Sequence, residues 1–131
     1  DFARKLKEIE DAGIPVIVIP GNHDINNTAA AQFTGAQALG TAHIGPEDFS
    51  EIYQDFGYDE AVSRDSASLS YVYQIDDYNR ALMLDTCQYA PYNQVGGMIQ
   101  EETYDWIEDQ MEDAWDLGMN VIPVGHHNLL D

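Results

Sequence analysis

The alternation of hydrophobic and polar positions predicts an amphipathic helix followed by a buried strand at the start of the chain. In residues 2–12, apolar residues recur at helical spacing among charged ones, and Gly13 follows where helices commonly end. Residues 14–19 are an almost wholly apolar run rich in Val and Ile, bounded by Gly and Pro. Such a run predicts a strand buried on both faces, as in a parallel sheet. The order helix then strand fits a βαβ unit whose first strand lies before this chain.

The middle of the chain combines a weakly patterned stretch with a predicted hairpin. Residues 25–66 carry little periodicity, apart from a helix predicted to start at Pro46 and to be closed by Gly57. An excursion of this length predicts a lid or side structure over a site. Residues 68–75 and 80–85 read as two strands joined by turn-forming residues, which predicts a hairpin.

The last third predicts one long helix and one short strand. Residues 100–117 have an apolar face at helical spacing, with acidic residues in the first turn and Gly118 at the end. Residues 120–124 are a short apolar strand that, like residues 14–19, runs into a glycine followed by polar residues. The pattern therefore predicts an α/β fold.

The net charge of the chain narrows its possible ligands and partners more than its length does. The chain has 131 residues, with 24 Asp and Glu against 5 Lys and Arg, and a net charge of −19. After Lys7 the only cations are Arg64 and Arg80. Without a basic stripe, binding to nucleic acid through the protein surface is excluded, and anionic membranes would repel the chain. A phosphate bound here would need another source of positive charge, for which a metal ion is the natural candidate.

The ends and the single cysteine add little. The chain opens without Met in the middle of a predicted helix and stops just after a histidine pair, so we expect residues 1–131 to be a fragment of a single larger domain. It has no apolar run of membrane-spanning length. Cys87 is alone, which rules out an internal disulfide and favours a small buried residue over a reactive thiol.

Two short stretches carry residues suited to chemistry. In GNHD, Asn22 offers a neutral oxygen ligand, His23 can donate or accept a proton, and Asp24 is placed to orient His23. A plain turn explains the same letters, since Pro-Gly-Asn is turn chemistry, but the apolar strand before it favours function. In GHHN, His126 and His127 follow the last strand; a metal ligand and a pair of exposed loop histidines both fit this stretch.

These two stretches are predicted to meet in space. Ligands in open α/β sheets collect at the carboxyl ends of parallel strands. Both stretches follow a strand that ends in glycine, so we expect Asn22 and His126 to lie at one edge of the sheet. His43 sits alone in a polar loop and is interpreted as a surface residue.

The stretches VIVIPGNHD and VIPVGHHN resemble the third and fourth motifs of the calcineurin-like metallophosphoesterases. The segments PEDFSEIYQDFGYDEAVSRD, LSYVYQ, LMLDT and HHNLLD resemble a bacterial branch that includes cyclic nucleotide phosphodiesterase-like enzymes, often exported or surface-attached. The compartment of this chain stays open. The resemblance implies a partial α/β/β/α sandwich with a mixed sheet, lacking its N- and C-terminal parts.

The resemblance also implies roles for single residues. Asn22 and His126 would be ligands of one metal, and His23 would protonate the leaving alkoxide or stabilise its charge. Asp24 would hold His23 in place, and His127 would lie at the edge of the pocket beside the substrate. The cofactor implied is a pair of divalent ions, for which Mn, Fe and Zn all suit mixed nitrogen and oxygen ligands.

The chain departs from the family pattern in ways that limit its activity. It contains no Asp-x-His and no Gly-Asp-x-x-Asp motif, and Asn128 stands where a Gly-His-x-His motif would have its second histidine. We therefore expect weak or no metal binding and no activity from residues 1–131 alone. The function predicted for the full-length protein is a metal-dependent phosphodiesterase acting on small phosphate esters, with cyclic nucleotides as candidates. The alternatives are a phosphomonoesterase or nucleotidase, and a non-catalytic binding domain of the same fold.

Overall fold

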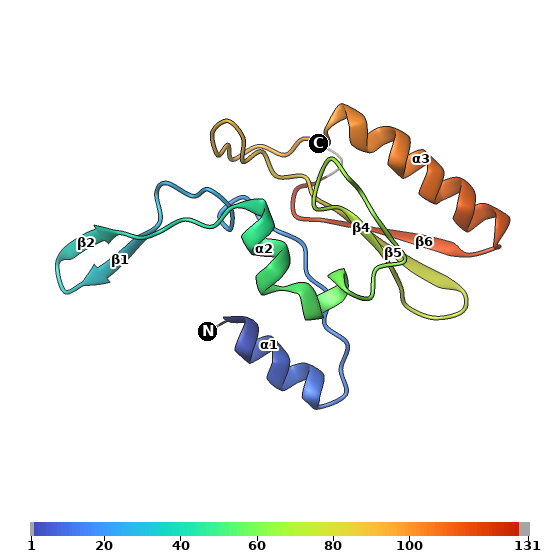
Figure 1. The fold of residues 1–131 in the computed structure, drawn as a ribbon, viewed down its shortest axis with the longest axis horizontal. Coiled ribbons are helices and arrows are strands. Elements are labelled where there is room, and N and C mark those ends of the chain that lie inside the picture. Colours follow the sequence, from blue (N-terminus) through green and yellow to red (C-terminus); the bar gives the residue numbers. More distant parts are fainter. Residues whose placement is uncertain (1, 129–131) are drawn as a thin grey trace.

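The computed structural model describes residues 2–128 as a mixed α/β structure with two sheets (Figure 1). A four-stranded sheet has the order β3-β4-β5-β6, and a separate two-stranded sheet pairs β1 with β2. The elements are α1 (Phe2–Asp11), β1 (Ala31–Thr34), β2 (Gln37–Gly40), α2 (Pro46–Ile52), a π-helical turn η1 (Gln54–Tyr58), β3 (Ser63–Arg64), β4 (Tyr71–Gln74), β5 (Asn79–Leu84), α3 (Glu101–Asp116) and β6 (Asn120–Gly125). The predicted α/β class is confirmed, and the larger sheet is mixed.

The larger sheet is built around β5. Strands β4 and β5 form the predicted antiparallel hairpin, and its turn is held by Asp76, whose carboxylate accepts hydrogen bonds from the Tyr78 N–H and the Asn79 side chain. Strand β6 pairs with β5 in parallel, and α3 makes the crossover between them. The long helix and the last strand predicted from the sequence are therefore confirmed.

Alternate residues of the hairpin face two separate apolar clusters. Val72, Leu82 and Leu84 pack against Trp106 and Ile107 of α3 on one face of the sheet. The other face is covered by residues from α2, η1 and the loop after residue 20; this cluster contains Tyr71, Ala81 and Met83 of the sheet together with Ile25, Phe49 and Tyr58. The period of two in a strand explains how one hairpin serves both clusters.

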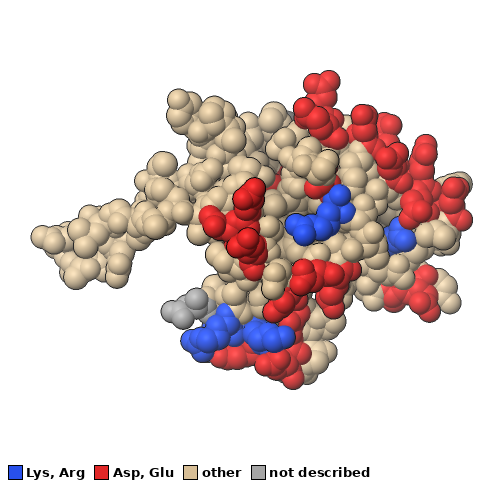
Figure 2. Space-filling model, in the orientation of Figure 1, with Lys and Arg blue, Asp and Glu red and all other residues tan. Residues whose placement is uncertain are grey.

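The outer surface of α3 carries much of the negative charge. Figure 2 shows acidic side chains gathered along the side of the molecule that α3 forms. The helix contains no Lys or Arg. One of its carboxylates, that of Asp113, accepts a hydrogen bond of 2.6 Å from the guanidinium of the largely buried Arg80 on β5. That ion pair ties the helix to the sheet it crosses.

Residues 14–19 are not the buried strand that the sequence predicted. They are extended but belong to neither sheet of the described residues, and from Val16 to Ile19 they are only half-buried. The Val18 N–H donates to the Phe56 carbonyl, and the Val18 carbonyl accepts a 2.6 Å hydrogen bond from the Tyr71 hydroxyl. The segment packs against an apolar cluster rather than extending the sheet. An apolar run indicates that a segment packs against other residues, but it does not reveal which backbone groups form its hydrogen bonds.

Strands β1 and β2 form an arm that the sequence pattern did not reveal. Figure 1 shows this hairpin projecting away from the rest of the molecule, so it is a side structure and does not lie over the sheet. Residues 25–46 contain no Asp, Glu, Lys or Arg, and the arm is correspondingly uncharged in Figure 2. Its large apolar residues, Phe33 and Leu39, are exposed.

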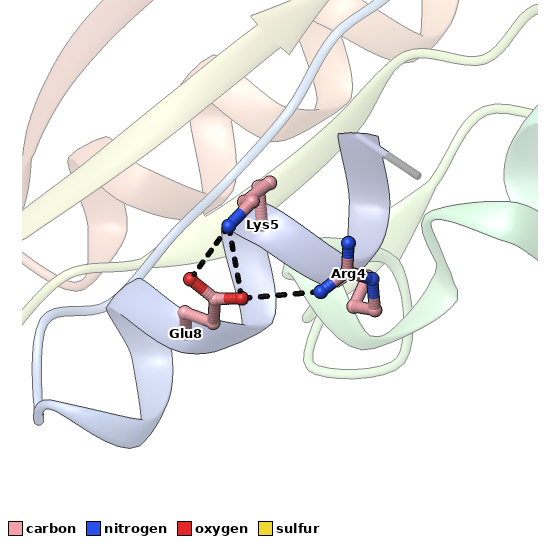
Figure 3. A network of polar contacts seen from close by, with 3 residues as sticks. All are labelled: Arg4, Lys5 and Glu8. Atoms are coloured by element: carbon pink, nitrogen blue, oxygen red, sulfur yellow. Dashed lines mark hydrogen bonds and ion pairs between the residues drawn. The ribbon is translucent and has the colours of Figure 1, made fainter.

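Helix α1 is held at the surface. None of its residues is buried, and Glu8 accepts hydrogen bonds from both Lys5 and Arg4 in the network of Figure 3. Exposed pairs of this kind contribute little stability. None of the helices in residues 2–128 has the length and apolar run needed to cross a bilayer.

A buried carboxylate joins α3 to the loop before β4. Asp65 accepts hydrogen bonds of 2.6 Å from both the Ser68 and the Thr103 hydroxyls, and Thr103 is 1% exposed at the start of α3. Burial by itself would raise the pKa of Asp65, but the hydrogen bonds from the Ser68 and Thr103 hydroxyls and from the backbone N–H groups of Ala67 and Ser68 together outweigh it and hold the pKa below its usual value.

The Thr103→Val substitution tests this link, because it keeps the shape and removes the donor. Asp65 stabilises the fold above its unfolded pKa, and this contribution is lost as the pH falls through the lower folded pKa. We expect the variant to lose about 1.5–3 kcal/mol of unfolding free energy at pH 7, with the loss shrinking below about pH 4. Urea unfolding at several pH values measures this. Thr41→Val, on the exposed arm, is the matched control, and an equal loss at every pH would contradict the charged hydrogen bond.

Candidate functional site

The carboxyl ends of β5 and β6 meet at one edge of the sheet. Their parallel register sets Leu84 opposite Gly125. The residues that follow, Thr86 after β5 and His127 after β6, are therefore neighbours, and the Thr86 hydroxyl lies 2.7 Å from His127 Nδ1. The segment of residues 14–19 reaches the same edge, where the Pro20 carbonyl accepts a hydrogen bond from the Cys87 thiol.

Asn22 and His126 are in direct contact at this edge, as the sequence predicted. The amide oxygen Oδ1 of Asn22 lies 2.9 Å from Nε2 of His126, although 104 residues separate them. Because an amide oxygen only accepts, Nε2 carries the proton in this arrangement. Asn22 is buried and His126 is exposed, so the pair has one face toward the protein and one toward solvent.

Gly21 permits the close approach of the His126 ring. A Cβ at this position would lie 3.1 Å from His126 Cε1 and 3.2 Å from both His126 Nδ1 and Asp24 Oδ2. Gly21 does not have positive φ. The glycine therefore leaves space for the ring and serves no special backbone conformation, and the turn brings the imidazole against the main chain.

Asp24 and His23 have different partners from those expected. The Asp24 carboxylate accepts a 2.8 Å hydrogen bond from the Gly21 N–H, which closes the turn. His23 is exposed, and its described hydrogen-bond partner is Asn27, whose amide nitrogen lies 3.1 Å from the His23 carbonyl and 3.4 Å from Nδ1. Among residues 2–128, no hydrogen bond joins Asp24 to His23, so Asp24 shapes the loop rather than the imidazole.

His127 is held through both of its ring nitrogens. Nδ1 lies 2.7 Å from the Thr86 hydroxyl, and Nε2 lies 2.9 Å from the Val95 carbonyl. The carbonyl only accepts, which assigns the Nε2–H tautomer and makes Thr86 the donor to Nδ1 in the neutral ring. The ring is thus fixed within the protein.

Asp85, which ends the strand run, organises the start of the following loop. Its carboxylate accepts hydrogen bonds from the N–H groups of Leu69 and Cys87 and from the Tyr89 hydroxyl. Burial raises the pKa of Asp85 above its ordinary value, although these hydrogen bonds oppose the shift. Burial also raises the pKa of the Cys87 thiol to about 12, which makes it unreactive at neutral pH.

The described residues fit a metal ion as a partial ligand set. Asn22 and His126 offer two neutral donors that suit Mn, Fe or Zn. Residues 2–128 contain no group of three or more His, Cys, Asp or Glu side chains that could hold a metal. A divalent ion bound by these two donors alone would be held weakly, because no carboxylate joins them.

Sequence reasoning missed Thr86 and Asn93 at this edge. Thr86 follows the apolar run of residues 80–85, as Asn22 and His126 follow theirs. The expectation that ligands collect at the carboxyl ends of strands could therefore have identified Thr86 as well. Asn93 lies in an irregular loop, and no periodicity marks it. The single histidine of the polar loop, His43, is exposed. No protein-family model and no curated protein matches this chain.

Gly21→Ala tests the close packing of the His126 ring. The added methyl group sits closer than ordinary van der Waals contact, so the ring must shift by a few tenths of an ångström. We expect the Nε2 signal of His126 to change in a histidine side-chain ¹H–¹⁵N spectrum, as its hydrogen bond to Asn22 weakens. Gly40→Ala, where a Cβ meets open space, is the control. A wild-type His126 signal in Gly21→Ala would contradict the packing described.

Proposed function

We propose that this chain forms part of a calcineurin-like metallophosphoesterase domain that hydrolyses phosphodiesters with two divalent metal ions. The contact between Asn22 Oδ1 and His126 Nε2 carries the proposal. The contact brings an amide oxygen and an imidazole nitrogen to one place. Both are donor types that Mn, Fe and Zn accept. The α/β/β/α sandwich belongs to the same proposal, supported by a mixed sheet with apolar clusters on both faces.

The charge of the chain supports a metal-dependent route. With a net charge of −19 and few cations, the protein has little Lys or Arg to neutralise a bound phosphate. When bound, the metal ions would supply that positive charge and a hydroxide at neutral pH. The carboxylate ligands absent from the described site would come from parts of the domain outside residues 1–131.

His23 is the proposed proton donor to the leaving alkoxide. It lies next to the ligand Asn22, its ring is exposed, and Asn27 restrains it near Nδ1. That leaves Nε2 as the nitrogen that would face a substrate. Asp24 would act indirectly, because its hydrogen bond with the Gly21 N–H closes the turn that contains Asn22 and His23.

His23→Ala in the full-length protein tests the proton donor. We expect turnover of bis-p-nitrophenyl phosphate to fall about 10²- to 10⁴-fold, with metal content retained, because His23 is not a ligand. Steady-state kinetics and elemental analysis measure the two quantities. His43→Ala, at an exposed histidine in the polar loop, should behave as wild type. Unchanged turnover in His23→Ala would rule out the catalytic role.

Asn22→Ala tests the metal ligand. Loss of the amide oxygen should lower metal content and abolish turnover together, whereas Asn27→Ala, in the same loop, should keep its metal. Elemental analysis after dialysis is the measurement. Full occupancy in Asn22→Ala would contradict the assignment.

Substrate choice and the non-catalytic alternative are decided on the same preparation. Comparing bis-p-nitrophenyl phosphate with p-nitrophenyl phosphate separates a diesterase from a phosphomonoesterase or nucleotidase. A strong monoester preference overturns the diesterase assignment. No hydrolysis of either ester, with no metal retained, would overturn the catalytic proposal and favour the non-catalytic alternative.

A further inference from the structure

The loop of residues 88–98 is closed on itself and lies between the two site loops. The Gln94 N–H donates to the Gln88 carbonyl at 2.8 Å, and the Gln88 side chain donates to the Gly96 carbonyl at 2.8 Å. The Met98 N–H donates to the Thr86 carbonyl at 2.9 Å, so the two ends of the loop are joined. Compact loops with closed ends present their tips in a fixed geometry.

One side of this loop holds the stretch that contains Asn22. The amide nitrogen of Asn93 donates to the Asn22 carbonyl at 2.9 Å and to the Ile25 carbonyl at 2.8 Å. Both acceptors are main-chain atoms, so this fork fixes the backbone of residues 22–25 and touches neither the Asn22 amide nor the His126 ring.

The other side holds His127. Val95 presents its carbonyl to Nε2, and Gly97 lies against the ring so closely that a Cβ there would stand 2.5 Å from His127 Cγ. Among the described residues, the hydrogen bond that directly joins residues 20–25 to residues 125–128 is the Asn22–His126 contact itself. Their spacing therefore also depends on segments that contact both. These are residues 86–87, through Cys87 to Pro20 and Thr86 to His127, and the loop of residues 88–98 that follows them.

We propose that the loop of residues 88–98 is a clamp that sets the spacing of Asn22 and His126, with Asn93 and His127 as its positioning residues. This rests on the proposed function only in taking Asn22 and His126 as ligands. His127, expected beside the substrate, acts instead through the main chain that it shares with His126. Groups that orient metal ligands without touching the metal typically change affinity or activity by about 10- to 100-fold when removed.

Two matched pairs of variants test the clamp in the full-length protein. Asn93→Asp is isosteric and removes the donating amide, while Gln94→Glu makes the same chemical change at an exposed neighbour. Gly97→Ala places a methyl group in the His127 ring, while Gly96→Ala meets its nearest atom at an ordinary 3.8 Å. Unfolding measurements accompany each variant, and because the two pairs act at opposite ends of the clamp, either pair decides the question if the other fails to fold.

The direct readout is the side-chain ¹H–¹⁵N spectrum at pH 7 without metal. In the wild type, His127 should give the signature of the Nε2–H tautomer. Asn93→Asp should shift the His126 Nε2 and Asn22 amide signals, although Asn93 touches neither side chain. Gly97→Ala should abolish the His127 signature and also shift His126. Gln94→Glu and Gly96→Ala should match the wild type. Wild-type His126 and Asn22 signals in folded Asn93→Asp or Gly97→Ala overturn the clamp.

A Zn²⁺ titration separates failure of the clamp from failure of the proposed function. Asn93→Asp should bind Zn²⁺ about 10- to 100-fold more weakly than Gln94→Glu. One outcome is that Asn93→Asp shifts the His126 and Asn22 signals while the wild type hydrolyses no phosphate ester. That outcome would reject the proposed function and support the clamp. Full hydrolysis and wild-type Zn²⁺ affinity in Asn93→Asp would reject the clamp and leave the proposed function standing.

Discussion

The parallel pairing of β5 with β6 is the constraint on which the site depends. With Leu84 opposite Gly125, both strands end at the same level, and the residues that follow them face one another. Strand register also fixes which face each side chain takes, since a slip of one residue exchanges the two faces. A slip here would part Thr86 from His127 and unpack both apolar clusters at once. The geometry of the edge is thus set by the core, and the loops add to it.

Two buried carboxylates, those of Asp65 and Asp85, bind the loops next to the sheet through hydrogen bonds. An unpaired buried charge costs free energy. The carboxylates of Asp65 and Asp85 are tolerated in the interior because hydroxyl and N–H groups donate hydrogen bonds to them. The Ser70 hydroxyl connects the two groups, accepting from the Asp85 N–H and bonding to Ser68. Asp85 fixes the residues where β5 turns into the loop of residues 88–98. The network therefore supports the start of the same loop that contacts the main chain of Asn22 and the ring of His127.

The sequence predicted the elements whose own pattern decides their structure. The β4–β5 hairpin, α3 and β6 follow from strand alternation, helical spacing and turn residues. The contact of Asn22 with His126 followed from the strand-end rule, although residues 14–19 do not join a sheet. The apolar run of residues 14–19 indicated contact with the core. It did not reveal that the Val18 backbone pairs with the Phe56 carbonyl and the Tyr71 hydroxyl, because both partners are distant in the sequence.

Other features depend on which of several possible partners a group takes in the folded chain. The partner of Asp24 is a backbone N–H three residues away, and a pattern of residue types cannot separate that turn from a bond to His23. The fork of Asn93 and the fixation of His127 require the loop of residues 88–98 to fold back on two other loops. The β1–β2 arm is a local hairpin, and its uncharged, weakly periodic sequence gave no strand signal.

We propose that a metal ion binds the Asn22–His126 pair while His127 stays bound to the protein. The most direct measurement is a Zn²⁺ titration of the full-length protein followed in the histidine side-chain ¹H–¹⁵N spectrum. We expect His126 Nε2 to lose its proton and to move to a metal-bound shift, while His127 keeps its Nε2–H signature. Zinc binding that leaves His126 unchanged, or that moves His127 in its place, would contradict it.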